Sequence, residues 1–384
     1  MGDVVHNMPI VQDILRHHPD ASIDWVVEEG YVGLVKLNPS VRNIIPFALR
    51  RWRKTLLSAA TRAEIRAFIA VLRGETYDAV LDTQGLLKTG VVMGLARLAP
   101  GGKKVGLANG TEGSGYEAIS RMFHTQSVAV DVRTHAVTRG RLVAAAALGY
   151  ALDAPPDFGM QAPQAPQARP EWMPQHHYAV FFHGTARDAK KWPKENWLEM
   201  AKLLAARGMP ILLPWGSEHE KHEAEQLAAG MSNAQVLPRL SMLDAVALAS
   251  HATLALGVDT GLTHIAAAFQ RPTIELYCDS PRWKTQGDWS DNIINLGDTG
   301  APPSVAEVKA ALALLLELPL PQAGEGPCKS KTLPVEPNSA FNELNIGRLP
   351  TPSPPAPLPL AGEGSKDAPT SLEAAPSSAD TKPC

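Results

Sequence analysis

The chain has 384 residues, of which 45% are hydrophobic and 20% are charged. This is about twice the length of a typical domain, so we expect two core-forming domains. A formal net charge of −3 argues against non-specific nucleic-acid binding by the whole surface. Three scattered cysteines cannot build a disulfide framework or a cysteine-based zinc site, which favours a reducing compartment. Because we identify neither a long apolar span nor a signal peptide, we expect a cytoplasmic protein.

The first half alternates helical and apolar segments. A helix is expected over residues 4–17, directly after Gly2 and Asp3. Apolar runs at residues 24–27 and 77–82 predict buried strands, and the pattern over residues 60–74 is typical of a helix. Residues 153–174 are rich in proline and have no periodicity, so we interpret them as a stiff interdomain linker.

The second half repeats the alternation. Strands are predicted at residues 178–182, 210–213, 254–258 and 273–277, and helices at residues 197–207 and 242–249. Strand–helix alternation in two blocks predicts two α/β domains with parallel sheets, residues 1–152 and 175–318. Ligands of such folds bind at the carboxyl ends of the strands, here in a cleft between the two domains.

The segment after residue 318 has one aromatic residue, Phe341, and two near-copies of one phrase, at residues 319–326 and 357–364. Such a composition buries too little apolar area to offset the entropy of ordering it. We therefore expect a disordered tail over residues 319–384. The alternative is a proline-rich ligand for a partner protein.

The strongest local motif is Asp-Thr-Gly-Leu-Thr-His at residues 259–264, where an apolar strand leads into a helix of small residues. A helix N-terminus presents unpaired amides to an anion, and Gly261 allows a ligand close to the backbone. The alternative interpretation makes Asp259 a helix cap and His264 a surface histidine.

Two other loops also follow apolar strands. Thr185, Lys190 and Lys191 offer a hydroxyl and two ammonium groups to an anionic ligand, although a solvated loop is the simpler interpretation. In the next loop, Trp215 can stack on a base and Glu220 can accept hydrogen bonds from ribose hydroxyls. Three polar loops at one sheet edge favour a nucleotide diphosphate site.

The first half contributes two further candidates. Arg50, Arg51, Arg53 and Lys54 place four cations within five residues. They form either a solvated helix face or a binding site for the phosphates or carboxylates of a large acidic acceptor. Asp3 is a single carboxylate at a helix start, which by itself indicates a cap.

These motifs resemble those of bacterial lipopolysaccharide heptosyltransferases, the ADP-heptose glycosyltransferases of family 9, and most closely the first-heptose type. The resemblance is carried by Met-Gly-Asp-Val at the start, Trp-Val-Val-Glu-Glu-Gly at residues 25–30, Arg-Arg-Trp-Arg-Lys at residues 50–54, Lys-Lys-Trp-Pro at residues 190–193 and the motif at residues 259–264. It covers most of residues 1–318. It implies a GT-B architecture, in which two Rossmann-like domains face each other across a cleft.

The resemblance also implies inverting transfer of L-glycero-D-manno-heptose from ADP-heptose to Kdo of Kdo2-lipid A. No essential metal, no cofactor and no nucleic-acid partner are expected, and the enzyme would be peripheral on the cytoplasmic face of the inner membrane. Asp3 would be the general base, and Lys190 would stabilise the leaving diphosphate. The other donor residues would be Thr185, Trp215, Glu220, Leu240, Asp259, Thr260, Gly261 and His264. Arg50, Arg51, Arg53 and Lys54 would hold the acceptor.

Three features depart from the family pattern. The family has an apolar strand before the Gly-Asp turn, whereas this sequence starts at Met1, so we expect the first strand of the first domain to be missing. Ala186 stands where the family often has a threonine, and residues 110–123 lack an arginine near Tyr116. The rival functions are transfer of the second heptose and non-catalytic binding of a nucleotide or sugar by a two-lobed protein.

Overall fold

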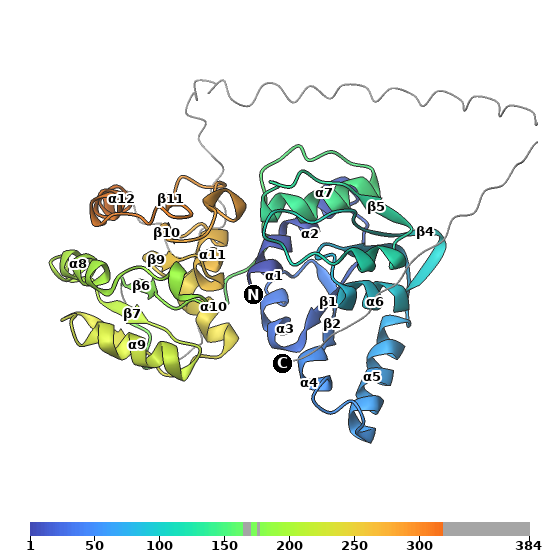
Figure 1. Cartoon of the computed structure of the whole chain (residues 1–384), viewed down its shortest axis with the longest axis horizontal. Helices are drawn as coiled ribbons and strands as arrows, with labels where there is room; N and C mark the ends of the chain where they lie inside the picture. The colour runs from blue at the N-terminus through green and yellow to red at the C-terminus, as the bar shows by residue number, and fades with distance from the viewer. Residues whose placement is uncertain (164–169, 175–176, 318–384) are drawn as a thin grey trace, which may run out of the picture. The chain divides into compact units, whose positions relative to one another are not determined.

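The computed structural model describes residues 1–163, 170–174 and 177–317 (Figure 1). The paired strands within these residues run parallel, which confirms the predicted α/β class. The predicted disordered tail at residues 319–384 and the middle of the predicted linker lie outside the described residues. We call residues 1–152 the first lobe and residues 177–317 the second lobe. Both belong to one compact unit, and the predicted domain boundaries stay a prediction.

The predicted N-terminal helix is two helices, α1 (Gly2–Asn7) and α2 (Pro9–His17). Pro9 has no amide hydrogen, so it cannot continue the helical hydrogen-bond ladder. The Val5 carbonyl accepts instead from the Met8 amide, at 3.0 Å. Asp3 lies in the first turn of α1, where the N-cap residue is Met1 and no side chain caps the helix. The interpretation of Asp3 as a cap is therefore wrong.

The first lobe contains two small parallel sheets. In one, β1 (Ile23–Glu28) pairs with β2 (Val41–Phe47). In the other, β4 (Arg97–Leu107) lies between β3 (Thr76–Asp82) and β5 (Gln126–Val128). Among the described residues, β1 and β3 each have one hydrogen-bonded neighbour. The absence of the family's first strand stays a prediction.

Helices connect and cover these strands. They are η1 (Glu29–Tyr31), α3 (Val32–Val35), α4 (Leu49–Trp52), α5 (Ala59–Leu72), α6 (Leu87–Leu95), η2 (Ala118–Phe123) and α7 (Ala136–Leu148). The predicted helix at residues 60–74 is α5, whose N-cap is Ser58, because the Ser58 hydroxyl accepts from the Thr61 amide. α7 ends at Leu148, and its C-cap is Gly149, whose φ of 78° is a left-handed conformation that glycine adopts readily.

The second lobe has one six-stranded parallel sheet, in the order β11-β10-β9-β6-β7-β8. Its strands are β6 (Ala179–Phe182), β7 (Ile211–Leu213), β8 (Ala234–Val236), β9 (Leu254–Val258), β10 (Thr273–Tyr277) and β11 (Ile293–Gly297). Its helices are η3 (Asp188–Lys190), α8 (Lys194–Ala205), α9 (Glu218–Ala228), α10 (Met242–Ser250), α11 (Gly261–Ala268), η4 (Arg282–Lys284) and α12 (Val305–Glu317). The chain adds strands on one side of β6 and then returns to β9 on the other. The β6–β9 pair is therefore the switch point, where open α/β sheets bind ligands.

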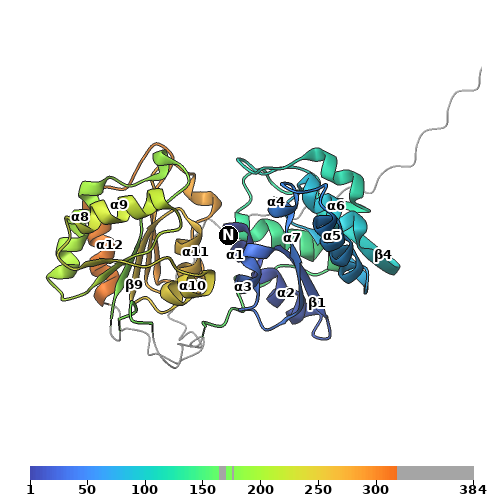
Figure 2. The same cartoon turned by 90° about the horizontal axis from the view of Figure 1, so that it is seen from below.

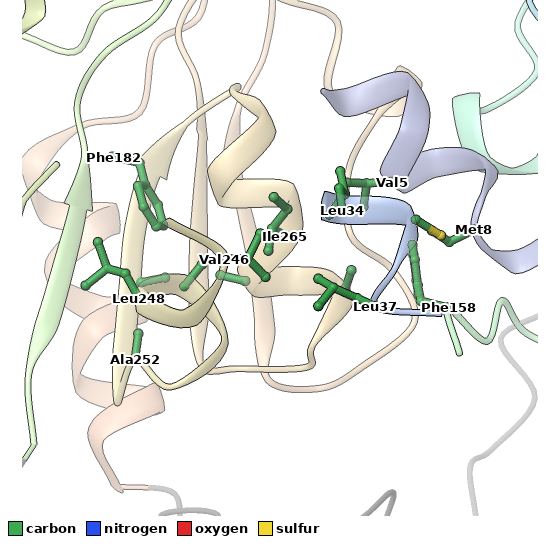
Figure 3. Close-up of a cluster of buried hydrophobic side chains, with 14 of the residues drawn as sticks. Val5, Met8, Leu34, Leu37, Phe158, Phe182, Val246, Leu248, Ala252 and Ile265 are labelled. Atoms are coloured by element: carbon green, nitrogen blue, oxygen red, sulfur yellow. The ribbon is translucent and has the colours of Figure 1, made fainter. Parts of the chain in front are cut away.

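The two lobes share a hydrophobic cluster (Figure 3). Val5, Met8 and Leu34 of the first lobe belong to the same buried cluster as Val246 and Ile265 of the second. α1 packs against α11, and α3 packs against α10 (Figure 2). Removing this apolar surface from water stabilises the contact between the lobes. The contact therefore places the N-terminal helix beside the Asp-Thr-Gly loop.

None of the helices in the described residues has the length and apolar character needed to cross a membrane.

Candidate functional site

The loops after β6, β7 and β9 lie at the same edge of the second sheet because these strands are parallel and adjacent. The Lys190 ammonium donates a hydrogen bond to Oδ2 of Asp259, which links the β6 and β9 loops. A Cβ on Gly184 would lie 2.9 Å from the carboxyl carbon of Glu220 in the first turn of α9, so the β6 loop also touches the segment that follows β7. The structure therefore brings together the three loops that the sequence singled out.

Asp259 and His264 form a second direct contact at this edge. The His264 ring is on α11, and its Nε2 lies 3.1 Å from Oδ1 of Asp259. His264 is 3% exposed, so its interpretation as a surface histidine is wrong. The N-cap residue of α11 is Thr260, and no side chain caps this helix. Asp259 is therefore not a cap; its carboxylate binds Lys190 and His264.

The electrostatics keep Asp259 ionised. Burial by itself would raise the pKa of the Asp259 carboxyl, but the His264 ring and the Lys190 ammonium outweigh it and hold that pKa well below its usual value. The hydroxyl of Thr285 also lies 3.4 Å from Oδ1. Asp259 is thus a fixed anion that orders one cation on each side.

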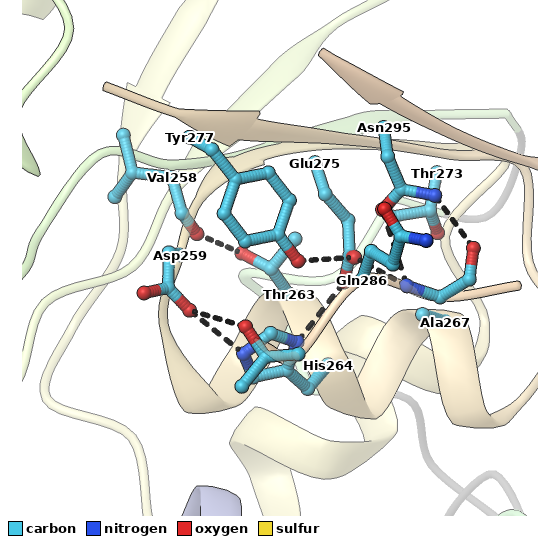
Figure 4. A network of polar contacts seen from close by, with 12 residues as sticks. Val258, Asp259, Thr263, His264, Ala267, Thr273, Glu275, Tyr277, Gln286 and Asn295 are labelled. Atoms are coloured by element: carbon cyan, nitrogen blue, oxygen red, sulfur yellow. Dashed lines mark hydrogen bonds and ion pairs between the residues drawn. The ribbon is translucent and has the colours of Figure 1, made fainter. Parts of the chain in front are cut away.

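Glu275 is a residue of this network that the sequence reasoning missed (Figure 4). It lies in β10, and its Oε1 is 3.0 Å from Nδ1 of His264. Its side chain is completely buried. The signal was present in the sequence, because Glu275 is the one charged residue in the apolar run at residues 273–277. Only the packing of α11 on β10 shows what it contacts.

In the loop after β7, the side chains that the sequence singled out already bond to protein groups. Oε2 of Glu220 accepts from the backbone amides of Gly216 and Ser217, at 2.7 and 3.1 Å, as part of the capping box of α9. The Trp215 indole donates to the Leu237 carbonyl at 2.7 Å. Lys221 lies over the Trp215 ring, 5.5 Å from its centroid. Thr185 and Leu240 are partly buried. These contacts fix the loop and leave the roles of Trp215, Glu220 and Leu240 as predictions.

The first lobe contributes α1 to this edge. Asp3 is exposed on α1, and its charge acts on Arg139 and Lys284, two cations that the sequence reasoning missed. A Cβ at position 261 would lie 2.8 Å from Sδ of Met1, so the Met1 side chain covers Gly261. An anion can reach the Thr260 and Gly261 amides closely only if that side chain moves.

The Arg50–Lys54 segment divides into two parts. Arg51 donates to both oxygens of Glu29 at 3.1 Å and also pairs with Glu64, and these carboxylates raise the pKa of its guanidinium above the ordinary value. Within the described part of the chain, the side chains of Arg50, Arg53 and Lys54 form no ion pair. All four residues are exposed, so those three cations are available to an anion.

Among residues 1–163, 170–174 and 177–317, no group of three or more histidine, cysteine, aspartate or glutamate side chains is arranged to hold a metal ion. The observed network instead alternates in charge: Lys190, Asp259, His264 and Glu275. Such an arrangement can bind and orient an anionic ligand through the Lys190 ammonium.

Comparison with known proteins gives this arrangement a context. The model of "Glycosyltransferase family 9 (heptosyltransferase)" matches residues 65–313. "Lipopolysaccharide heptosyltransferase 1" of Escherichia coli K12 is 37% identical over 289 residues, which span 72% of this chain and 84% of that protein.

Two solved structures match both lobes. The structure titled "E. coli heptosyltransferase WaaC with ADP" is 33% identical, with a TM-score of 0.70, and the match covers 82% of this chain and 97% of that one. The complex of the same enzyme with ADP-2-deoxy-2-fluoro heptose is 34% identical, with a TM-score of 0.67, and covers 82% and 96%. The α/β fold with parallel sheets is thus the GT-B fold of these enzymes. With a family model that spans most of the chain and a relative of this identity, the chain belongs to glycosyltransferase family 9, the heptosyltransferases.

Proposed function

We propose that this chain transfers L-glycero-D-manno-heptose from ADP-heptose to Kdo of Kdo2-lipid A, with inversion and without an essential metal, at the cytoplasmic face of the inner membrane. The observation that carries the proposal is the Lys190–Asp259 contact at the β6–β9 switch point, beside α1 with its exposed Asp3. This juxtaposition supplies the two groups that an inverting transfer needs, a cation for the leaving diphosphate and a carboxylate for the attacking hydroxyl.

The donor half of the proposal rests on the second lobe. Lys190 would leave Asp259 and bind the diphosphate. The amides of Thr260, the N-cap of α11, and of Gly261, its first residue, would add donors at the positive end of the helix dipole. Together they would neutralise the charge that develops on ADP as the glycosidic bond breaks. Relatives solved with ADP and with an ADP-heptose analogue support this choice of donor.

The remaining donor contacts are proposed from loop position. Thr185 lies in the loop after β6, and Glu220 lies in the first turn of α9, which follows β7. The Trp215 indole donates to the Leu237 carbonyl, and Leu240 lies in the same loop between β8 and α10 as Leu237. They would border the ribose and the adenine. Lys221 lies over the Trp215 ring, so the adenine would either displace this ammonium or use the other face of the indole.

The acceptor half rests on the first lobe. Arg50, Arg53 and Lys54 present free cations to the phosphates and carboxylates of Kdo2-lipid A, and Arg51 orders the segment through Glu29 and Glu64. The segment continues into Leu56 and Leu57, which are 51% and 88% exposed. Cations followed by exposed leucines suit a lipid whose anionic head group adjoins an apolar region. This composition supports a first-heptose acceptor at a membrane surface.

The base would be Asp3. A carboxylate is ionised at neutral pH and can accept the proton of a Kdo hydroxyl as the new bond forms. The charge of Asp3 acts on the cations Arg139 and Lys284, which would hold an anionic acceptor nearby. Asp3 would not touch the diphosphate, so its role is separable from that of Lys190.

The test supplies ADP-heptose together with either Kdo2-lipid A or Kdo2-lipid A that already carries one heptose. Mass spectrometry of the lipid and release of ADP report transfer, and NMR of the product reports the anomeric configuration. We expect one heptose on Kdo2-lipid A with inversion. Transfer only to the heptosylated lipid would identify a second-heptose enzyme. Binding of ADP without any transfer would identify a non-catalytic binding protein.

A further inference from the structure

Glu275 is a carboxylate at zero exposure in the middle of the apolar strand β10. Burial of an ionised carboxylate is costly unless hydrogen-bond donors surround it. Oε1 faces Nδ1 of His264 at 3.0 Å, and Oε2 accepts from the Tyr277 hydroxyl and the Gly287 amide, each at 2.9 Å (Figure 4). Both oxygens therefore have partners that can donate, as an ionised carboxylate requires.

His264 has a carboxylate at each ring nitrogen. Nε2 faces Asp259 at 3.1 Å and Nδ1 faces Glu275 at 3.0 Å. A neutral imidazole carries one N–H, so one of the two nitrogens would then turn a lone pair toward a carboxylate; an imidazolium donates from both. Burial by itself lowers the pKa of His264, but Glu275 and Asp259 outweigh it and raise that pKa to about 10.

The other charged or titratable neighbours do not replace Glu275. The His6 ring of α1 lies 4.9 Å from the His264 ring, and burial together with the His264 charge lowers the pKa of His6 well below its usual value. His135 has its pKa lowered as well, chiefly by burial. Tyr277 has its pKa raised well above the ordinary value by burial and by Glu275. Within the described residues, Glu275 and Asp259 are thus the anions that contact the His264 ring.

We propose that Glu275 is a positioning residue that keeps His264 an imidazolium, so that Asp259 can release Lys190 to the donor. The inference rests on the proposed donor function and concerns a residue that this function does not itself require. The four groups alternate in sign, from Lys190 through Asp259 and His264 to Glu275. When Lys190 turns to a diphosphate, Asp259 keeps a cationic partner in His264.

The consequence without Glu275 follows from the same geometry. With its negative charge gone, one carboxylate instead of two opposes the effect of burial, so the pKa of His264 falls from its raised value toward its ordinary one. A neutral His264 leaves Lys190 as the one cation bonded to Asp259, whose side chain is 10% exposed. Because an unpaired anion at that depth is costly, Asp259 would hold Lys190 back from the diphosphate. Glu275 would therefore act on donor affinity without touching the donor.

The experiment compares ADP affinity of the parent and of Glu275→Gln by calorimetry at pH 6 and at pH 9. The variant keeps the size and one acceptor oxygen but loses the charge. We expect a near-parental Kd at pH 6, where His264 is protonated in both proteins. At pH 9 the variant should bind ADP about tenfold or more weakly, as expected for loss of a charge-assisted contact.

Two further variants separate charge from packing. Tyr277→Phe removes a hydrogen bond to the Glu275 carboxylate but leaves the charge of that carboxylate in place. The ratio of the Tyr277→Phe Kd for ADP to the parental Kd should therefore be equal at the two pH values. Glu275→Asp also keeps the charge and should restore most of the affinity at pH 9. A pH-dependent loss in Tyr277→Phe as large as in Glu275→Gln would overturn the proposal.

A measurement on the parent does not depend on whether any variant folds. In protein labelled with ¹⁵N-histidine, His264 should carry protons on both ring nitrogens at pH 8, with its signal assigned by its loss in His264→Gln. A neutral ring at pH 8 would overturn the proposal. The proposal would also be overturned if the parent binds ADP and the ratio of the Glu275→Gln Kd to the parental Kd is the same at pH 6 and at pH 9. If the parent binds no ADP, the donor assignment fails as well, which is a different result.

Discussion

Lys190 follows β6 and Asp259 follows β9, and their side chains are bonded across the point where the strand order of the second sheet changes direction. These residues are 69 positions apart in the sequence. Their contact places a cation at the part of the sheet where open α/β folds bind their ligands. The donor site of this glycosyltransferase is therefore expected around that contact.

Lys190→Ala should weaken donor binding. A hydrogen bond from a charged group contributes about 1.5–3 kcal/mol, so Kd for ADP should rise about 10- to 150-fold, as measured by calorimetry. Lys191→Ala is a matched control, since Lys191 pairs with Asp188 and Glu223 and not with Asp259. An unchanged Kd in Lys190→Ala and an unchanged kcat/KM for ADP-heptose would exclude Lys190 from the site.

In the parent, ADP should protect residues 178–277 from hydrogen exchange.

Asp3→Asn should slow the chemical step. Asparagine keeps the size of the side chain but cannot accept a proton at neutral pH. General base catalysis contributes about 10²–10⁴-fold, so kcat should fall by that factor while Kd for ADP stays the same. Asp20→Asn, at another exposed aspartate of the first lobe, is the control. Turnover of a folded Asp3→Asn protein at the parental rate would remove Asp3 from the mechanism.

The double variant Arg53→Ala with Lys54→Ala should raise KM for the acceptor and reduce its dependence on salt, with donor affinity unchanged. The reason is that both cations are exposed and form no ion pair within the described residues. The control is Lys202→Ala with Lys309→Ala, which removes two cations that pair with Glu199 in the second lobe. If donor affinity fell and acceptor KM held, the segment would belong to the donor site.

Asp13→Ala should destabilise the fold. Asp13 of α2 and Arg141 of α7 form a buried bidentate pair, at 2.6 and 2.9 Å, with side chains 4% and 6% exposed. Removing one partner leaves an uncompensated buried charge, which costs about 3–5 kcal/mol of the free energy of unfolding in urea. Asp153→Ala breaks the exposed Arg16–Asp153 pair and should cost about 0–1 kcal/mol. Equal losses in the two variants would contradict this assignment.

Most strands were predictable because their signal is local. The apolar runs at residues 24–27, 77–82 and 254–258 lie within β1, β3 and β9, and the run at residues 273–277 is β10. A buried parallel strand is apolar on both faces, so a short window of sequence suffices to predict it. The break between α1 and α2 was also readable, since Pro9 marks it, but the predicted helix ran through it.

The sequence predicted which loops carry the residues of the candidate site, but not which residues contact one another there. Asp259, Lys190 and His264 were singled out because they follow strands whose ends must meet. Whether His264 is a surface residue or a buried one depends on how α11 packs against β10 and α1, which no local pattern reports. The same holds for Arg51, which belongs to a run of cations in the sequence but binds Glu29 and Glu64 in the fold.

The sequence by itself thus determined the α/β class, the parallel strands, the loops that carry polar residues and the family resemblance, because each depends on patterns within short stretches of residues. Only the tertiary structure decided the charges and contacts at the site. The ionisation of His264 depends on two carboxylates from different elements and on the exclusion of water, and these exist only when α11 lies on β10. Burial strengthens electrostatic interactions by lowering the local dielectric, and burial is a property of the packed chain.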